Sequence, residues 1–596
     1  MLLPTLLFFL AFAPPDGAAV YKQRCALCHD RSADTRAPAP AALRQMASAS
    51  IVRALESGLM KDQGALLTAE EKSSVAEFLG SKVGGANARV NNCAPGRFVA
   101  SPGWSGWGAD AENTRYQPLG LAAAQVPNLK LKWAFAFPGT FVSNGPPSVY
   151  GGRVFVPSAN RTIYSLDGAT GCEYWEFQAE APVRTALTIA GVGQRNVVFF
   201  GDQRGNAYSL DASSGELLWK THIDDQSRAR IVGAPVFYQG RVYVPLTDGE
   251  EGPSMSPNYE CCSGRGGLVA LDGATGKVIW KTYTIDEAAH VTGKNPAGAK
   301  TWGPSGASIW SAPTIDAEKG LIYAGTGDNF TDPSTKTSDA VIAFDMKDGH
   351  IVWVKQLTED DVFNMGCMEG RNHGCRPGEK IGPDFDIGAS PILVKLANGK
   401  RVLLVSQKSA FIHALDPDNK GEILWRAQLG KGTELGGIQW GSASDGKNMY
   451  AALSDIGFLY VGTPPKRILD PKAGGGLFAF EVATGKKVWE AKPPECGERL
   501  NCSPAQSAAI SAIPGAVFSG SADGHLRAYA SADGKIIWDF DTTREFTTVN
   551  GITAKGGSMD GPGPVIAGNM LFAPSGYAAW GGLPGNVLLA FTVEGK

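Results

Sequence analysis

The amino-acid sequence predicts an all-β propeller of eight blades that follows a small N-terminal all-α domain. The first observation is a ten-residue unit, Leu271–Trp280, in which one strand ends at Leu-Asp, a glycine closes a tight turn and a return strand carries Trp. The second is that tryptophan recurs at 42 to 73 residue intervals, at Trp133, Trp175, Trp219, Trp280, Trp353, Trp425, Trp489 and Trp538. The third is that repeats of about 40 to 50 residues are typical of propeller blades, so the longer intervals indicate insertions.

The two ends of the repeat region are predicted to share one blade. Trp133 lacks the first half of the turn unit, and the C-terminal segment Leu588–Phe591 can supply it. The alternative is an open β-rich array with coincidental tryptophan spacing. A closed ring protects the sheet edges that an open array would expose, so closure is favoured.

The composition fits an exported β-rich protein. The 596 residues include 75 glycines and 37 prolines, which suit many tight turns, and 43% of the residues are hydrophobic. The net charge of -3 gives no reason to expect a nucleic acid or an anionic membrane as partner. Ten cysteines, several in close pairs, favour an oxidising compartment.

Composition divides the chain into four parts. Residues 1–13 contain an apolar run with an Ala-x-Ala exit, like a secretion signal, although the usual basic start is missing. Residues 14–84 are Ala-rich and helical in pattern, residues 85–103 form a linker, and residues 104–596 alternate strands with turns. The apolar run is too short for a membrane helix. We therefore expect a periplasmic or secreted protein with no stable membrane span.

A haem attachment motif lies in the N-terminal domain. In Cys25-Ala-Leu-Cys28-His29, two thiols one helical turn apart can form thioethers to a haem, and His29 can then reach the iron. A disulfide or a zinc half-site is the alternative. Zinc would need two further ligands, and the next cysteine after His29 is Cys93. We therefore expect covalent haem c, and the domain is identified as a cytochrome c-like domain.

The sixth iron ligand is expected to be Met60. Residues 48–59 and 68–79 are predicted helices, the second opening with a Thr-x-x-Glu capping box. Met60 follows the first of these helices at a loop, whereas Met46 lies in a helix-like stretch and is more typical of core packing. His/Met ligation raises the haem potential, which suits an electron acceptor.

The propeller region resembles the pyrroloquinoline quinone (PQQ) dehydrogenases. The resemblance begins at the segment Trp104–Tyr116, includes the Gly-to-Trp turns and extends to about Phe591. A cytochrome c domain before such a propeller is similar to the polyvinyl alcohol dehydrogenases. The resemblance implies oxidation of an alcohol, polymeric or small, with electrons passing from PQQ to the haem and on to an acceptor such as a soluble or membrane cytochrome c.

The same resemblance assigns residues to the cofactor. It implies that the PQQ rings stack on Trp310, next to Ser308, and that Arg184, Lys408 and Trp440 also contact the cofactor. Trp310 falls outside the blade repeat, which leaves its presence without a packing explanation. The adjacent pair Cys261 and Cys262 can close a vicinal disulfide ring or remain two buried thiols. In the family such a ring lies against PQQ, but here it stands later in the chain than usual.

Three acidic residues resemble the calcium and base constellation of the family. They are Glu250, Asp328 and Asp361, and hard oxygen ligands are what calcium requires. Asp361 is expected to take the substrate hydroxyl proton while hydride passes to the quinone. Each is, by composition alone, a common solvated turn residue. Asn144 stands where the family often has Glu, which departs from the pattern.

The remaining cysteines suggest loop crosslinks whose pairing the sequence does not fix. Cys367 with Cys375, and Cys496 with Cys502, are close enough for loop staples, which leaves Cys93 and Cys172 to join the linker to the first blade. A different class of function also stays open, because propeller folds serve many roles. In that alternative the propeller is a non-catalytic binding scaffold and the haem transfers electrons separately.

Overall fold

The computed structural model describes most of the chain, namely residues 15–30, 37–38, 40–44, 46, 48–56, 60–80, 91–94, 98–101, 103–368, 374–463, 466–492, 495–497, 499 and 502–595. The predicted signal, residues 1–13, lies outside them. The chain divides into two compact units, the first formed by residues 1–87 and 579–581 and the second by residues 88–578 and 582–596.

The first unit is all-α, and its longest helix confirms the predicted cap. The helices are α1 (Gly17–Arg24), α2 (Ala26–His29), α3 (Pro40–Leu43), α4 (Ser48–Glu56), α5 (Lys61–Gly64) and α6 (Ala69–Leu79). Thr68 Oγ1 accepts the N–H of Glu71 at 3.2 Å, and the Glu71 carboxylate accepts the N–H of Thr68 at 2.8 Å. This capping box satisfies two amides that the first turn of α6 would leave unpaired.

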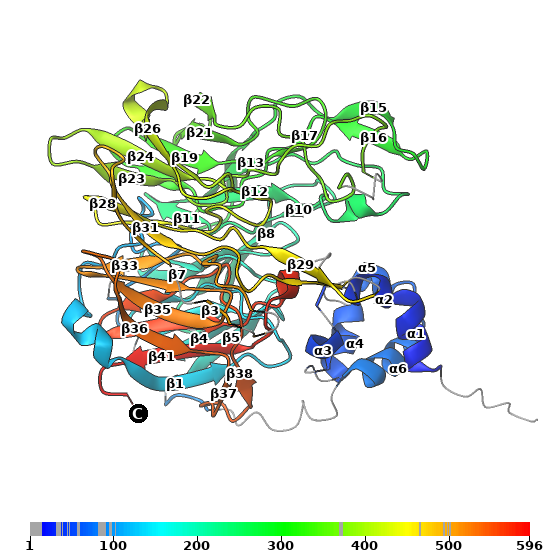
Figure 1. Ribbon diagram of the computed structural model, residues 1–596, viewed down its shortest axis with the longest axis horizontal. Helices are drawn as coiled ribbons and strands as arrows, with labels where there is room; N and C mark the ends of the chain where they lie inside the picture. The colour runs from blue at the N-terminus through cyan, green and yellow to red at the C-terminus, as the bar shows by residue number, and fades with distance from the viewer. Residues whose placement is uncertain are drawn as a thin grey trace, which may run out of the picture. The chain divides into compact units, whose positions relative to one another are not determined.

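The second unit is an eight-bladed propeller of antiparallel four-stranded sheets, as predicted (Figure 1). The first three blades are β2 (Ser148–Tyr150), β3 (Arg153–Pro157), β4 (Thr162–Asp167) and β5 (Glu173–Gln178); β6 (Thr188–Val192), β7 (Arg195–Gly201), β8 (Asn206–Asp211) and β9 (Leu217–His222); and β11 (Val236–Tyr238), β12 (Arg241–Asp248), β13 (Gly267–Asp272) and β14 (Val278–Tyr283), with β10 (Ala229–Arg230) also paired to β12. The next two are β18 (Thr314–Asp316), β19 (Leu321–Gly325), β21 (Ala340–Asp345) and β22 (Ile351–Gln356); and β23 (Ile392–Lys395), β24 (Arg401–Ser406), β25 (Phe411–Asp416) and β26 (Glu422–Gln428).

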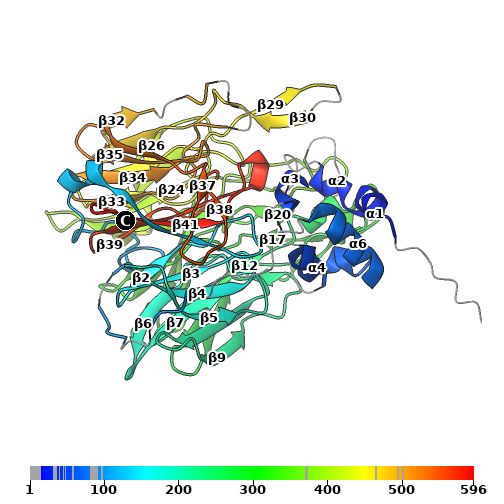
Figure 2. The same cartoon turned by 90° about the horizontal axis from the view of Figure 1, so that it is seen from below.

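The last three blades complete the ring. They are β27 (Ala443–Ser444), β28 (Asn448–Ala452), β31 (Leu477–Glu481) and β32 (Lys487–Ala491); β33 (Ser511–Ile513), β34 (Ala516–Gly520), β35 (His525–Ala530) and β36 (Ile536–Asp541); and β39 (Val565–Ala567), β40 (Met570–Ser575), β41 (Val587–Thr592) and β1 (Lys130–Ala136). The final blade, of which β39 and β41 are labelled in Figure 2, joins the two ends of the propeller. Trp133 of β1 pairs with Ala590 of β41. The predicted closure by the C-terminal segment is confirmed.

The turn glycine and the tryptophan of the repeat bind neighbouring blades together. The indole N–H of Trp219 donates to the carbonyl oxygen of Gly273 at 3.0 Å, in the turn of the next blade. At the turn glycine Gly276, with φ of 71°, a Cβ would lie 2.6 Å from the Trp219 ring. The position therefore needs glycine for both its left-handed backbone and its contact with the indole. The same contact recurs around the ring, at Gly171 on Trp133, Gly215 on Trp175, Gly349 on Trp280, Gly421 on Trp353, Gly485 on Trp425 and Gly534 on Trp489.

Short strand pairs and 3₁₀ turns complete the described structure. They are β15 (His290–Lys294) with β16 (Lys300–Gly303), β17 (Ser305–Gly306) with β20 (Asn329–Thr331), β29 (Phe458–Val461) with β30 (Lys466–Leu469), β37 (Glu545–Phe546) with β38 (Ala554–Lys555), η1 (Ala123–Asn128), η2 (Pro253–Met255), η3 (Pro417–Asn419) and η4 (Ala579–Gly581). Among the described residues, none of the helices combines the length and apolarity that a membrane crossing requires.

Four disulfide bonds form as the sequence suggested. They pair Cys93 with Cys172, Cys261 with Cys262, Cys367 with Cys375, and Cys496 with Cys502. The first joins the segment before the propeller to the edge of β5, where the N–H of Cys93 also donates to the carbonyl oxygen of Glu173 at 2.9 Å. Cys25 and Cys28 are the two cysteines outside these bonds.

Candidate active site

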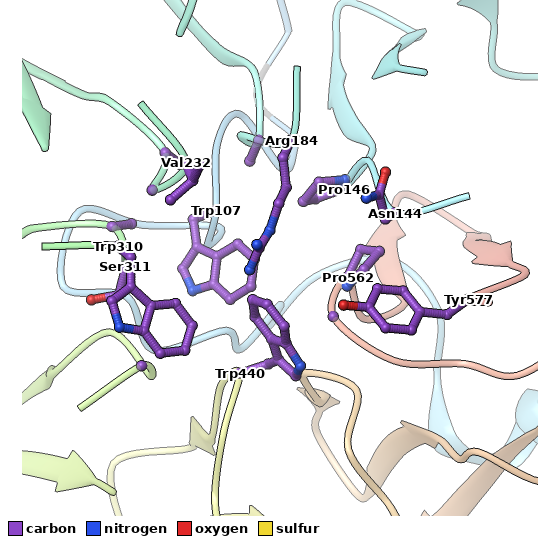
Figure 3. A pocket seen from close by; sticks show the side chains of 16 residues that line it. Trp107, Asn144, Pro146, Arg184, Val232, Trp310, Ser311, Trp440, Pro562 and Tyr577 are labelled. Atoms are coloured by element: carbon purple, nitrogen blue, oxygen red, sulfur yellow. The ribbon is translucent and has the colours of Figure 1, made fainter. Parts of the chain in front are cut away.

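A pocket lies where the innermost strands of the propeller converge. Its lining comes mainly from the segments that lead into the first strands of seven blades (Figure 3). The lining residues are Trp107, Asn144, Pro146, Arg184, Ala186, Val232, Gly233, Ala234, Trp310, Ser311, Ala312, Gly388, Trp440, Gly561, Pro562 and Tyr577. Three predicted cofactor residues, Arg184, Trp310 and Trp440, are thus brought together from separate blades.

Two aromatic rings lie between two cations along one side of the pocket. The Arg184 guanidinium lies 4.5 Å from the ring centroid of Trp440, which meets the Trp310 ring edge to face at 5.4 Å. On Trp310 in turn lies the Lys408 ammonium, 5.7 Å from the ring centroid. Cations over indole faces are attracted by the ring quadrupole. A row of contacting side chains therefore connects the pocket to the ionic group around Lys408. It runs through Arg184, Trp440, Trp310 and Lys408.

Lys408 is buried between two carboxylates. Its ammonium donates to Asp384 at 2.6 Å and to Asp386 at 2.9 Å, while Asp386 also accepts the N–H of Asp328 at 2.8 Å. Burial acts to lower the pKa of Lys408, but the two carboxylates outweigh it and raise the pKa. The lysine is therefore charged and fixes both carboxylates in place.

The carboxylate oxygens of Asp328, Asp384 and Asp386 lie within 4.8 Å of one another. Asp328 Oδ2 is buried and has no hydrogen-bond partner among the described residues. Burial first, and then the charges of Asp386 and Asp384, raise the pKa of Asp328 well above its usual range. The group offers hard oxygen ligands, one of them unpaired, and carries three carboxylates against one lysine. It therefore fits a divalent cation such as calcium.

These groups share one end of the propeller because of the blade topology. In an antiparallel four-stranded blade, the start of the first strand, the link from second to third, and the end of the fourth strand lie at the same end. Asp328 follows the second strand β19, Lys408 lies in the β24–β25 turn, and Asp361 and Asp384 lie between β22 and β23. The residues that line the pocket precede first strands at this end as well.

Asp361 lies beneath the segment that carries Asp384 and Asp386. Its carboxylate accepts the N–H of Asp384 at 3.2 Å and that of Phe385 at 2.8 Å, and its side chain is fully buried. A Cβ on Gly382 would lie 2.1 Å from Asp361 Oδ1, so the segment packs directly on this carboxylate. Burial raises the pKa of Asp361, with the two backbone N–H groups opposing it. Asp361 thus supports the Asp384 segment, and the prediction that it is the general base stays a prediction.

Glu250 is not part of the three-aspartate group, whose carboxylate oxygens lie within 4.8 Å of one another. Its carboxylate accepts the Tyr259 hydroxyl at 2.8 Å and the N–H groups of Ser263 and Gly264 at 2.6 and 2.7 Å. Tyr259 precedes the Cys261–Cys262 disulfide along the chain, and Ser263 and Gly264 follow it. Glu250 is therefore committed to holding this connection, and its predicted role as a metal ligand stays a prediction.

The end of β12 contains a strongly perturbed acid, and the β12–β13 connection contains the vicinal disulfide. Burial and the nearby Glu250 charge raise the pKa of Asp248 to about 8, and Ser308 Oγ accepts the Asp248 N–H at 3.0 Å. Cys261 and Cys262 are buried against Phe330. Neither the disulfide nor Ser308 is among the residues that line the pocket. Their predicted contact with the cofactor stays a prediction.

His29 in the N-terminal unit is arranged to bind iron through one ring nitrogen. His29 is buried, its Nδ1 lies 2.8 Å from the carbonyl oxygen of Pro38, and burial lowers its pKa. A neutral imidazole that donates from Nδ1 leaves Nε2 to act as the ligand. Cys25 immediately precedes α2, and Cys28 lies within it, beside His29. The residues present therefore fit a covalent haem.

Both methionines considered for the distal side lie at helix ends. Met60 is the residue before α5, and its carbonyl oxygen accepts the N–H of Gly64 at 2.7 Å. Met46 lies between α3 and α4 rather than inside a helix. The expectation that Met46 sits in a helical stretch is therefore wrong, because α4 begins only at Ser48. The choice of Met60 stays a prediction.

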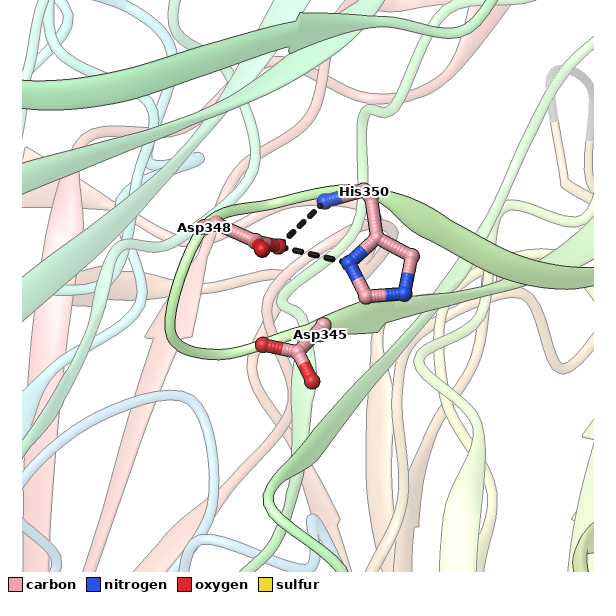
Figure 4. A group of neighbouring side chains, drawn as sticks. All are labelled: Asp345, Asp348 and His350. Atoms are coloured by element: carbon pink, nitrogen blue, oxygen red, sulfur yellow. Dashed lines mark hydrogen bonds and ion pairs between the residues drawn. The ribbon is translucent and has the colours of Figure 1, made fainter.

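An exposed group of Asp345, Asp348 and His350 has an ordinary turn explanation. Asp348 accepts the N–H of His350 at 3.1 Å and lies 2.6 Å from its Nδ1 (Figure 4). Asp345 accepts the N–H of Lys347 at 2.7 Å. These bonds close the β21–β22 turn of the repeat, so the group is assigned no ion.

Full-length relatives decide the family. The chain is 40% identical to a polyvinylalcohol dehydrogenase of a Pseudomonas species over 98% of this chain and 94% of the relative. It is 41% identical to the polyvinylalcohol dehydrogenase of Sphingopyxis sp. strain 113P3 over 98% of this chain and 93% of the relative. The chain belongs to the polyvinyl alcohol dehydrogenase family. It is a PQQ-dependent alcohol dehydrogenase with a cytochrome c domain as electron acceptor, as predicted.

Family models match both units of this polyvinyl alcohol dehydrogenase family member, and a solved structure shares its fold. Residues 104–368 match the beta-propeller domain of glucose, ethanol and alcohol dehydrogenases, residues 408–554 match outer membrane protein assembly factor BamB, and residues 12–79 match cytochrome c oxidase cbb3-type subunit III. The quinohemoprotein alcohol dehydrogenase of Comamonas testosteroni has a similar fold, with TM-score 0.57 and 18% identity over 86% of this chain and 84% of that one. The non-catalytic scaffold alternative is therefore not supported for the whole chain.

Several residues of this site are not among those that the sequence predicted. Asp384 and Asp386 form an Asp-x-Asp segment at the end of the long connection after Trp353, which is the signal that could have identified them. Trp107 lies in the segment that carried the resemblance, but its place in the pocket lining depends on tertiary structure.

Proposed function

We propose that this enzyme oxidises secondary alcohol groups, and that its substrate is polyvinyl alcohol. The substrate assignment is supported by the 40% and 41% identity, over 98% of the chain, to two proteins named polyvinylalcohol dehydrogenase. When bound, PQQ supplies the two-electron acceptor for the carbinol hydrogen. The chain supplies binding, orientation and the proton acceptor.

The pocket is the proposed PQQ site. Unpaired buried polar atoms point to a ligand there: among the described residues, Trp107 Nε1, Asn144 Oδ1 and Ser311 Oγ have no hydrogen-bond partner. A flat tricarboxylate needs aromatic faces and cationic groups, which Trp310, Trp440 and Arg184 provide. Asn144 would offer an amide in place of the carboxylate common in the family, which reduces negative charge near the ligand.

Asp384 is the proposed general base. A base must reach a hydroxyl hydrogen with an oxygen that is not already committed. Asp361 uses its carboxylate to hold two backbone N–H groups, whereas Asp384 has one oxygen on Lys408 and no other side-chain hydrogen bond among the described residues. Asp361 is then a positioning residue whose loss displaces Asp384.

Calcium is the proposed cation of the three-aspartate group. Asp328, Asp384 and Asp386 would hold it through carboxylate oxygens, and a bound dication would favour the ionised form of each acid. The charge on Lys408 keeps Asp384 and Asp386 ordered when no cation is present. The dication would also act as a Lewis acid beside the pocket.

The proposed location is the periplasm or the exterior of the cell. The four disulfides favour an oxidising compartment, and covalent haem attachment at Cys25 and Cys28 is compatible with it. Electrons would leave the haem for a soluble or membrane acceptor such as a cytochrome c. A small alcohol or a sugar is the alternative substrate.

Haem reduction tests the substrate directly. The holoprotein with PQQ and calcium is mixed with polyvinyl alcohol, with small secondary and primary alcohols, and with glucose, and the reduced-haem absorbance is followed. We expect reduction with polyvinyl alcohol at a higher kcat/KM per hydroxyl than with any small alcohol. Reduction by a primary alcohol or glucose, with none by polyvinyl alcohol, would replace the polymer with that substrate.

A further inference from the structure

The indole of Trp440 is held by an acid that lies behind the pocket wall. Trp440 Nε1 donates to Asp560 Oδ1 at 2.5 Å, and the Ser507 hydroxyl donates to the same oxygen at 2.8 Å. Asp560 immediately precedes Gly561 and Pro562, which line the pocket. One carboxylate oxygen thus connects three segments that meet near the propeller axis.

Trp440 transmits this constraint to the rest of the pocket. Its ring is in contact with the Arg184 guanidinium at 4.5 Å and meets Trp310 edge to face at 5.4 Å, with an interplanar angle of 82°. An indole can rotate about two side-chain bonds, and a charge-assisted hydrogen bond to its N–H removes much of that freedom. An indole fixed in this way presents one edge to Trp310 and one face to Arg184 without reorganisation on binding.

We propose that Asp560 is a positioning residue of the quinone site, which fixes the Trp440 indole so that Trp310 and Arg184 are preorganised for the planar cofactor. This inference rests on the proposal that PQQ occupies the pocket, and it is independent of which alcohol is oxidised. Asp560 acts through Trp440 and does not itself need to touch the cofactor.

The charge of Asp560 distinguishes positioning of the indole from a direct effect of the carboxylate on the ligand. A carboxylate that acted directly on a ligand with three carboxylates would repel it, so removal of the charge would tighten binding. A carboxylate that acts by holding the indole would have the opposite effect, because its removal frees the ring. Burial raises the pKa of Asp560, while Ser507, Trp440 and Arg184 favour its ionised form. An asparagine keeps an acceptor for the indole N–H in either case.

The experiment measures PQQ affinity in the full-length protein without PQQ, by quenching of tryptophan fluorescence, together with the unfolding temperature. We expect Asp560→Ala to weaken PQQ binding about tenfold and Asp560→Asn to stay within about threefold of the native protein. Trp440→Phe should weaken binding as well, and Asp560→Ala should add little to it, because the indole N–H is then absent.

Two control variants separate positioning from folding and from pocket placement. Asp202→Ala removes another buried carboxylate, one that accepts the Tyr208 hydroxyl at 2.7 Å outside the pocket, and it should lower the unfolding temperature without changing PQQ affinity. Trp310→Ala should weaken PQQ binding strongly. Unchanged affinity in Asp560→Ala, tighter affinity, or an undiminished effect in the Trp440→Phe background would each overturn the positioning role. If Trp310→Ala bound PQQ normally, the pocket assignment would fall, and this inference with it.

Discussion

The Asp361 carboxylate accepts the backbone N–H of Phe385 at 2.8 Å and is fully buried beneath the segment that bears Asp384 and Asp386. The sequence predicted Asp361 as the proton acceptor, and this contact gives the same residue a structural role. Holding the loop and receiving the substrate proton are different tasks, and a carboxylate with both oxygens on backbone N–H groups is suited to the first.

Asparagine substitutions distinguish the two acids. Asp384→Asn should lower kcat about a hundredfold or more, because it removes the proton acceptor. It should also lower the unfolding temperature, because buried Lys408 then keeps only Asp386 as its counter-charge. Asp361→Asn should lower kcat less and lower the unfolding temperature, because one amide N–H would then face the N–H groups of the loop. Turnover of polyvinyl alcohol and thermal unfolding measure both effects. A hundredfold loss in Asp361→Asn at normal stability, with near-normal turnover in Asp384→Asn, would return the base to Asp361.

Lys408 gives a test of the cation. Lys408→Met leaves Asp384 and Asp386 buried without their counter-charge, and breaking such a buried pair typically costs about 3 to 5 kcal/mol. We expect the variant without metal to unfold at lower temperature, and calcium to raise its unfolding temperature more than that of the native protein. The control is Lys395→Met, whose exposed ion pair to Glu318 should matter little. Equal calcium stabilisation of Lys408→Met and the native protein would place the cation elsewhere.

The blade architecture could be predicted because its determinants are local in sequence. The turn glycine and the tryptophan of a unit such as Gly276 and Trp280 stand four positions apart, and each unit repeats the same contact with its neighbour. The haem motif is likewise compact, so its residue spacing alone indicates the chemistry. Repetition and short spacing therefore made the propeller and the haem motif predictable from the sequence.

The cation group could not be predicted in the same way. Asp328 and Asp386 are joined by a hydrogen bond from the Asp328 N–H, yet they belong to different blades and are separated by a long connection. Aspartate is common in exposed turns, so its residue type alone does not reveal burial. Family resemblance found Asp328 and Lys408, but only the fold reveals that Asp384 and Asp386 flank the lysine.

The haem unit carries a prediction on attachment. Because Cys25 and Cys28 are expected to form thioethers, acidified acetone should leave the haem on the polypeptide, and Cys25→Ala with Cys28→Ala should release it. Loss of all haem from the native protein on extraction would contradict covalent attachment.

The distal ligand is a separate prediction. Met60→Ala should lower the haem potential and change the low-spin absorption spectrum, because a thioether ligand raises the potential. Met46→Ala is the matched control and should leave both unchanged. The reverse result would assign the ligand to Met46.

His413 should make the propeller sensitive to acid. It lies buried in β25, and neither ring nitrogen has a hydrogen-bond partner among the described residues. Burial, with the charges of Arg426 and Lys355, lowers its pKa to about 4. In the unfolded chain the pKa is about 6.5, so the folded state binds fewer protons between these two values. Stability is therefore complete above pH 6.5 and is lost as the pH falls toward 4, by up to about 3 kcal/mol.

His413→Phe should remove this loss, because phenylalanine fills the site without a titrating group. The urea midpoint of the propeller transition, measured at pH 7.5 and at pH 4.5, should fall less in the variant than in the native protein. His350→Asn is the matched control: His350 is exposed beside Asp348, which raises its pKa, so its loss should not reduce acid sensitivity. A histidine with a raised pKa contributes stability at low pH. His350→Asn should therefore lose at least as much stability between pH 7.5 and pH 4.5 as the native protein does. If His413→Phe and the native protein lost the same stability at pH 4.5, protonation of this histidine would not be what weakens the propeller in acid.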